Sequence, residues 1–253
     1  MRAPQSDLPD IAADVLERVR ARRPRIHCIT NAVAQNITAN VLLAAGAVPS
    51  MTISPDEIAA FAARADALLV NLGTFDAERQ VAADTAIAKV NASKIPWVLD
   101  PVLIDRSPPR ADYAQQLLRL KPAALRLNAA EFETLAGAAS PESLAAKNGV
   151  IVALTGQTDR ITDGTRGFQI ANGHALMAHV TAMGCAGSAL VATALAVEPD
   201  RLKAVASALL LFGIAGEVAG DNADGPGSFA VQILDALFRL DRATIHARAK
   251  VTS

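Results

Sequence analysis

Cys185 lies in the stretch TAMGCAGSAL, residues 181–190, where a thiol could take part in chemistry. The stretch follows turn-rich sequence and is expected to open a helix, whose first N–H groups are unpaired and attract anions. The positive end of a helix also favours the thiolate, which is the reactive form of cysteine. We therefore predict an anion site with a thiol shifted towards the thiolate. The alternative is that Cys185 packs as a small hydrophobic residue.

Polar residues occur where the predicted strands end. They are Thr30 and Asn31 after 25–29, Asn71 in 67–71, Asp100 in 96–100, Asn128 in 124–128 and Thr155 after 149–154. In an open α/β sheet, ligands bind beyond the carboxyl ends of the strands. Any one of these residues could instead cap the next helix, which is the simpler interpretation of Thr30 or Asn71 taken alone. Together they predict a polar cleft along one edge of the sheet.

Asp100 and Glu131 could hold a divalent cation at this edge. Glu131 lies three residues after Asn128, one helical turn beyond a strand end. Mg²⁺ is usually held by one or two carboxylates together with waters and substrate phosphates. The alternatives are helix capping by Asp100 and a solvated helix face for Glu131. Arg126 lies on an otherwise apolar strand, where a cation is costly unless paired, so it contacts either a ligand phosphate or a carboxylate.

The elements that must position these residues follow from the hydrophobic pattern. Short apolar runs alternate with longer Ala-rich segments, which is typical of βαβ units and of a doubly wound α/β fold. Continuous apolar runs such as ALLVN indicate parallel strands that are buried on both faces. Turn-forming pairs in 155–174 predict a β-hairpin at the sheet edge. A further strand is expected at 47–51, in addition to the strands 25–29, 67–71, 96–100, 124–128 and 149–154. The expected helices are an amphipathic N-terminal helix and the segments 33–45, 56–65, 77–92, 110–119, 129–147, 184–197, 200–220 and 226–240.

Composition narrows the class of protein. The chain has 253 residues, of which 51% are hydrophobic and 4% aromatic, and we expect residues 1–253 to form one α/β domain. A net charge of −1 gives no basic surface for nucleic acid or an anionic membrane, so a small-molecule partner is favoured. The apolar runs 189–197 and 204–215 are too short for a membrane span and are expected to be buried helices. The N-terminus does not resemble a signal peptide, which predicts a cytoplasmic protein.

Two further sequence features are interpreted as structural. The two cysteines, Cys28 and Cys185, show no disulfide or zinc spacing and are expected to be reduced thiols. His27 lies on an apolar strand, where a hydrogen-bonded core histidine is favoured over a catalytic one. Neither a dinucleotide-binding GxGxxG nor a P-loop motif follows a predicted strand.

In combination and order, several motifs resemble the hydroxyethylthiazole kinase family of thiamine metabolism, within the ribokinase-like superfamily. The resemblance covers roughly residues 8–240. It rests on HCITNAVAQNITANVLLAAGAVPSM (27–51), ALLVNLGT (67–74), VLDPV (98–102), RLNAAE (126–131), ALTGQTDRITDG (153–164), NGH (172–174), VTAMGC (180–185) and GPGSF (225–229).

The resemblance implies a three-layer α/β/α fold with a mostly parallel sheet and an edge hairpin. It implies ATP- and Mg²⁺-dependent phosphorylation of the hydroxyl of 4-methyl-5-(2-hydroxyethyl)thiazole, in thiamine biosynthesis, by a homotrimer. The matched positions are Arg126, Thr155 and Asn128 for ATP, Asp100 and Glu131 for the metal, Asn31, Met51, Ala182 and Gly184 for the thiazole at a subunit boundary, and Cys185 for phosphoryl transfer. Most ribokinase-like relatives carry an aspartate where Cys185 stands.

The sequence departs from the family pattern at two positions, Ala182 and Leu103, where the family usually has glycine. If these positions require a positive φ, a side chain adds strain there. Two alternatives stay open on this account. One is a ribokinase-like enzyme with another small alcohol or a dehydratase reaction, and the other is a non-catalytic copy that binds thiazole or nucleotide.

Overall fold

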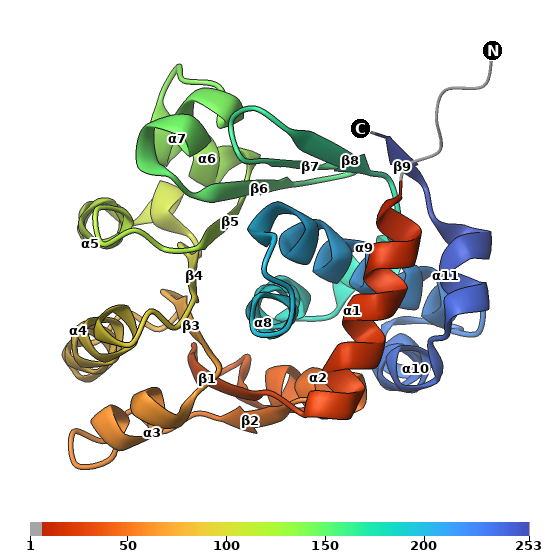
Figure 1. Ribbon diagram of the computed structural model, residues 1–253, viewed down its shortest axis with the longest axis horizontal. Helices are drawn as coiled ribbons and strands as arrows, with labels where there is room; N and C mark the ends of the chain where they lie inside the picture. The colour runs from red at the N-terminus through yellow and green to blue at the C-terminus, as the bar shows by residue number, and fades with distance from the viewer. Residues whose placement is uncertain (1–6, 253) are drawn as a thin grey trace.

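A computed structural model describes residues 7–252, and within them nine strands form one sheet. The strand order is β2-β1-β3-β4-β5-β6-β7-β8-β9 (Figure 1). Neighbouring strands from β2 to β6 are parallel, and β7, β8 and β9 continue the sheet in antiparallel pairing. The strands are β1 Arg25–Ile29, β2 Val48–Ser50, β3 Ala67–Asn71, β4 Trp97–Asp100, β5 Ala124–Asn128, β6 Ile151–Thr155, β7 Asp159–Thr162, β8 Gly167–Ile170 and β9 Val251–Thr252.

Helices cover both faces of the sheet and complete three layers (Figure 1). One layer contains α3 Ile58–Arg64, α4 Ala77–Ala92, α5 Pro108–Leu118, α6 Ala129–Ala136 and α7 Pro141–Asn148. The other contains α1 Leu8–Arg22, α2 Gln35–Ala45, α8 Met183–Leu195, α9 Arg201–Gly220, α10 Pro226–Arg239 and α11 Arg242–Arg248. Two short 3-10 helices occupy Ile104–Arg106 and Ala175–His179. The predicted α/β/α architecture is confirmed.

The apolar strands are continuous because both of their faces are buried. In β3, Ala67 and Leu69 pack into the core under α8 and α9, whereas Leu68 and Val70 pack into the core under the opposite helices. Successive side chains of a strand point to opposite faces, so each face needs its own apolar set. This explains why ALLVN shows no alternation between apolar and polar residues.

The C-terminal half of the expected element list needs three corrections. The predicted helix 129–147 is two helices, because Gly137 ends α6 at a positive φ of 58° and Ser140 caps the start of α7. The predicted hairpin is present as β7 and β8, but β9 pairs with β8, so the hairpin does not form the sheet edge. The helix α11 was not among the expected elements.

The two long apolar runs form α8 and α9, and both are buried as predicted. By length and hydropathy alone, the 20 residues of α9 could cross a membrane, since the helix extends beyond the apolar run 204–215. In the fold, 89% of the most apolar 18-residue window of α9 is buried inside the protein. The burial identifies α9 as a core helix of the fold.

Candidate active site

A chain of buried and partly buried hydrogen bonds joins three strand ends to the start of α8. Asn31, after β1, donates from Nδ2 to Oδ1 of Asn71 at 3.1 Å and to the Cys185 sulfur at 3.3 Å. Asn71, the last residue of β3, donates in turn to Oδ2 of Asp100 at 2.7 Å. Parallel strands end at the same edge of a sheet, and α8 packs against β1, β3 and β4. The predicted polar edge therefore includes the predicted catalytic residue.

Ser188 completes this network from the helix side. Its hydroxyl lies one turn after Gly184 and donates to Oδ2 of Asp100 at 2.8 Å. Both hydrogen bonds to the Asp100 carboxylate within residues 7–252 use Oδ2, so Oδ1 is left to accept a further hydrogen bond or to bind a cation. Sequence reasoning did not identify Ser188 as a partner of Asp100. The signal it missed was a hydroxyl in the middle of an apolar helix, which needs a buried partner.

The environment of the Cys185 thiol favours its protonated form. Burial is the main cause, and the negative charge of Asp100 adds to it, so that the pKa of Cys185 rises to about 11. Hydrogen bonding with Asn71 and Asn31 and the charge of Arg126 lower the pKa but are weaker. The predicted shift towards the thiolate is therefore wrong, because desolvation outweighs the helix N-terminus at this site.

Burial also raises the pKa of the two carboxyl groups near Cys185. For Asp100, desolvation opposes the charge of Arg126 and the two hydrogen bonds at Oδ2. For Glu131, desolvation dominates and the charge of Asp100 adds to it. Proton affinities raised in this way mark a place where a positive charge would be stabilised.

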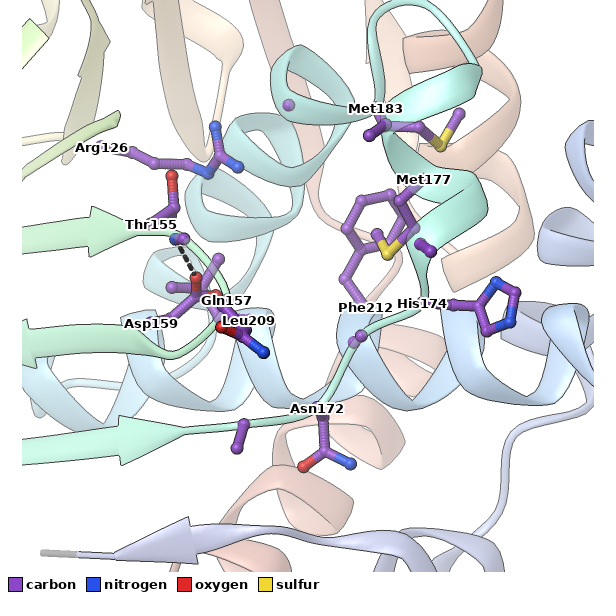
Figure 2. A pocket seen from close by; sticks show the side chains of 17 residues that line it. Arg126, Thr155, Gln157, Asp159, Asn172, His174, Met177, Met183, Leu209 and Phe212 are labelled. Carbon is purple, nitrogen blue, oxygen red and sulfur yellow. Dashed lines mark hydrogen bonds between the residues drawn. The ribbon is translucent and has the colours of Figure 1, made fainter. Parts of the chain in front are cut away.

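Arg126 points from β5 into a cavity of about 670 Å³ (Figure 2). Within residues 7–252 its buried Nε has no hydrogen-bond partner, and no ion pair involves its guanidinium. A Cβ on Gly184 would lie 3.2 Å from a terminal nitrogen of Arg126, so this glycine allows the close approach of the guanidinium to the start of α8. An unpartnered buried donor with a positive charge is a site for an anionic ligand.

The cavity brings together three of the predicted residues, Arg126, Thr155 and Gly184. Thr155 ends β6, and its hydroxyl donates to the Leu127 carbonyl at 3.3 Å. The remaining wall residues include members of the motifs at 153–164, 172–174 and 180–185, but none of them was assigned a role from the sequence: Gly156, Gln157, Asp159, Ala171, Asn172, Gly173, His174, Ala175, Met177, Ala178, Met183, Leu209, Phe212 and Gly213. Asp159 accepts a hydrogen bond at 2.9 Å from the Gly156 N–H, which closes the turn after β6.

Asn128 and Glu131 form a capping box at the start of α6. The Asn128 side chain accepts from the Glu131 N–H at 3.0 Å, and Glu131 Oε2 accepts from the Asn128 N–H at 2.8 Å. The other carboxylate oxygen of Glu131 accepts from the Leu103 N–H at 2.9 Å. Asn128 is not among the residues that line the cavity, so its contact with nucleotide stays a prediction. Glu131 is buried and caps the helix α6, so it does not lie on a solvated helix face, which was the alternative to a metal-binding role.

Ala182 and Leu103 both have a left-handed backbone. Ala182 precedes α8 with a φ of 66°, and Leu103 precedes the short helix after β4 with a φ of 58°. These are the two positions where glycine was expected from the family pattern. The left-handed region is unfavourable for residues with a Cβ, so both side chains add strain beside the site.

The β1 and β2 end of the sheet holds the remaining predicted residue, Met51. Met51 directly follows β2 and packs, partly buried, against the core of α8 and α9. Next to it, His27 is fully buried, with Nδ1 2.8 Å from Ser50 Oγ and Nε2 3.0 Å from the Thr52 carbonyl. Both ring nitrogens are engaged, which confirms the core role predicted for His27.

The chain has a ribokinase-like fold. A ribokinase-like superfamily protein from Enterococcus faecalis shares the fold, with a TM-score of 0.65 at 16% identity over 91% of this chain and 95% of that chain. The sequence model of the hydroxyethylthiazole kinase family matches residues 16–143 and 139–243. The chain belongs to the hydroxyethylthiazole kinase family and is a kinase.

Individual relatives agree with this assignment. The hydroxyethylthiazole kinase of Cronobacter sakazakii is 45% identical over 243 residues, which are 89% of this chain and 92% of that protein. The structure of the hydroxyethylthiazole kinase protein from Pyrococcus horikoshii has a TM-score of 0.93 and 37% identity, and it covers 96% of this chain and 98% of that chain.

Proposed function

We propose that this protein transfers the terminal phosphoryl group of ATP to the hydroxyl of 4-methyl-5-(2-hydroxyethyl)thiazole, with Mg²⁺, in thiamine biosynthesis. One observation supports it above the others. Gly184 lines the cavity that contains the unpartnered Arg126, and the next residue, Cys185, belongs to the buried network of Asn31, Asn71 and Asp100. The start of α8 therefore adjoins a site for an anion on one side and a polar site on the other.

The cavity fits a nucleotide that enters with its phosphates towards α8. Its volume of about 670 Å³ lies within the range for small-molecule sites. Arg126 supplies the positive charge, and the free N–H groups at the helix start supply further donors for a phosphate. In phosphoryl transfer, catalysis consists mainly of positioning and of stabilising charge, which these groups provide.

Asp100 and Glu131 fit Mg²⁺ bound together with the polyphosphate. Asp100 keeps Oδ1 free, and each Glu131 oxygen accepts one backbone N–H, which leaves each a lone pair. No group of three or more His, Cys, Asp or Glu side chains in residues 7–252 could hold a metal alone, so phosphates and waters would complete the coordination. The ion would neutralise charge on the transferred phosphoryl group.

Cys185 is proposed to hold the thiazole hydroxyl in line with the phosphoryl group. A thiol with a pKa of about 11 is neutral at physiological pH and is a poor proton acceptor. As a neutral group it can still exchange hydrogen bonds with an alcohol, while Asn31 fixes its position. The attacking atom is the oxygen of the substrate, and the phosphoryl group moves to it directly from the nucleotide.

A trimer is proposed to complete the thiazole site next to β1 and β2. Asn31 and Met51 lie at this end of the sheet, where β2 is a short edge strand. Exposed apolar side chains occur on elements that pack together there, namely Leu43 in α2, Val48 in β2 and Val231 in α10.

The two free cysteines fit the predicted cytoplasmic location, where thiols stay reduced.

A coupled assay of ADP release tests the proposed function. We expect Mg²⁺-dependent turnover with hydroxyethylthiazole and much slower turnover with hydroxymethylpyrimidine, a pyrimidine alcohol. Mass spectrometry of the product should show one added phosphoryl group on the thiazole. Nucleotide binding without turnover of either alcohol would instead indicate a non-catalytic copy, and turnover of the pyrimidine alone would indicate a different substrate class.

A further inference from the structure

One wall of the cavity is a connecting segment, residues 171–178, that lies directly on α9. The contact is close because three glycines of α9 face the segment. A Cβ on Gly213 would lie 2.6 Å from the Asn172 carbonyl oxygen, and one on Gly220 would lie 2.4 Å from the His174 ring. A Cβ on Gly216 would meet the Met177 sulfur at 2.7 Å. The position of this wall therefore depends on how it is held against α9.

The side chain of Asn172 holds the wall from outside the cavity. In Figure 2 its amide points away from Arg126 and Thr155, and only 8% of the residue is exposed. Nδ2 donates to Glu217 Oε1 at 3.0 Å and to the Arg248 carbonyl at 2.8 Å. Oδ1 accepts from the Lys250 N–H at 2.8 Å. One buried amide thus connects the wall to α9 and to the end of the chain.

Glu217 and the C-terminal segment, residues 248–252, complete this attachment. Glu217 lies on α9, one turn after Gly213, and its Oε1 also accepts from the Gly173 N–H at 3.3 Å and from Lys250 Nζ at 2.9 Å. The Ala171 N–H donates to the Lys250 carbonyl at 2.9 Å. A buried carboxylate is stable only when it is paired and hydrogen-bonded, so Glu217 fixes the groups that surround it.

We propose that Asn172 and Glu217 are positioning residues for the nucleotide and that the C-terminal segment sets nucleotide affinity without entering the cavity. The proposal rests on the proposed function, in which ATP occupies this cavity. These groups act through the wall: Asn172 and Gly173 both line the cavity and make the hydrogen bonds to Glu217. Loss of the attachment lets the wall move away from α9 and weakens the contacts it makes to the nucleotide.

Arg242 provides a matched control in the same part of the chain. Its guanidinium pairs with Asp14 at 2.5 Å and with Glu17 at 3.0 Å, so it attaches α11 to α1. It is not among the residues that line the cavity. A substitution of Arg242 therefore loosens the C-terminal region without releasing the cavity wall.

The experiment measures the Kd of MgADP by calorimetry, and kcat and KM by steady-state kinetics, for Asn172→Ala, Glu217→Ala and a chain that ends at residue 248. We expect the Kd and the KM for ATP to rise about fivefold or more, since one net hydrogen bond corresponds to about that factor. The kcat and the KM for the thiazole should change little, because Cys185 and Asn31 are untouched. Glu217→Gln keeps an acceptor and should restore most of the affinity.

The controls separate this role from a general loss of stability. Arg242→Ala should lower the melting temperature with an unchanged Kd for MgADP. If all of the folded variants bind MgADP as tightly as wild type, the inference is wrong while the proposed function stands. If wild type itself binds no nucleotide, both fail. Should Asn172→Ala not fold, the shortened chain and the Glu217 pair decide the question.

Discussion

At the scale of single residues, the chemistry depends on a buried neutral thiol. If Cys185 positions the substrate hydroxyl, Cys185→Ser should retain part of the rate, because a hydroxyl can make similar hydrogen bonds. Cys185→Ala should lower kcat by about tenfold, which is less than the ~10²–10⁴-fold contributed by a general acid or base, because the neutral thiol only positions the hydroxyl. The Kd for MgADP should stay the same in both variants. Unchanged turnover in Cys185→Ala would return this residue to a packing role.

The protonation state of this thiol can be measured directly. Burial and the charge of Asp100 raise its pKa to about 11, so the thiolate forms only above pH 9. Thiolate absorbance near 240 nm should therefore show no step between about pH 6 and 9. The difference spectrum between wild type and Cys185→Ser isolates this thiol, since Cys28 is present in both. A step below about pH 8 in that spectrum would contradict the proposed positioning role.

Backbone strain at Ala182 gives a prediction with a defined sign. The left-handed φ of 66° costs a residue with a Cβ about 1–2 kcal/mol, and glycine avoids this cost. Glycine in turn destabilises the fold by about 0.5–1 kcal/mol, because its unfolded chain has more conformational entropy to lose. Ala182→Gly should therefore raise the free energy of unfolding by about 0.5–1 kcal/mol. Denaturant titration measures it. Ala88→Gly, on the exposed face of the helix α4, is the control and should lower the free energy by about 1 kcal/mol.

At the scale of elements, the pairing of β1 with β2 contains a histidine that resists protonation. Burial lowers the pKa of His27 from 6.5 to about 4. The Thr52 carbonyl can only accept, so Nε2 carries the proton of the neutral ring and Nδ1 accepts from Ser50. Protonation would force Nδ1 to become a donor and would place a charge in the core.

This histidine should make the protein less stable in mild acid. Because the folded pKa lies below the unfolded value, the unfolded chain binds the proton first as the pH falls below 6.5. Between pH 7 and 5 the free energy of unfolding should drop by about 2 kcal/mol from this group alone. His27→Phe removes that contribution, so its stability should change less over the same interval. Equal pH dependence in urea titrations of both proteins would show that His27 does not contribute.

At the scale of the whole molecule, the proposed trimer gives a further prediction. Sedimentation should report a mass of about three times the 26.3 kDa of the chain. Leu43→Lys, in the helix α2, should shift the protein towards the monomer and raise the KM for the thiazole, because a charge replaces an apolar contact. Val81→Lys is the control. Val81 is 56% exposed and Leu43 is 55% exposed, but Val81 lies on α4 in the opposite layer. A monomeric wild type with full activity would exclude the trimer.

The helices and parallel strands could be predicted because their signals are local. The apolar run ALLVN, the repeated βα alternation and the cap at Asn128 each depend on neighbours in the sequence. The division of 129–147 was missed although Gly137 and Ser140 lie within it, because helix formers on both sides hide one short break. The strand β9 was missed because two residues carry no pattern, and only their pairing with β8 defines them.

The sequence by itself determined the fold class, the family motifs and the edge of the sheet at which Asn31, Asp100, Arg126 and Thr155 would gather. It could do so because parallel βα units place successive strand ends on one side. Only the tertiary structure decided the protonation state of Cys185, the hydrogen bond of Ser188 and the hold of Asn172 on the cavity wall. Each of these depends on burial and on partners distant in the chain, and desolvation by such partners has no signature in the local sequence.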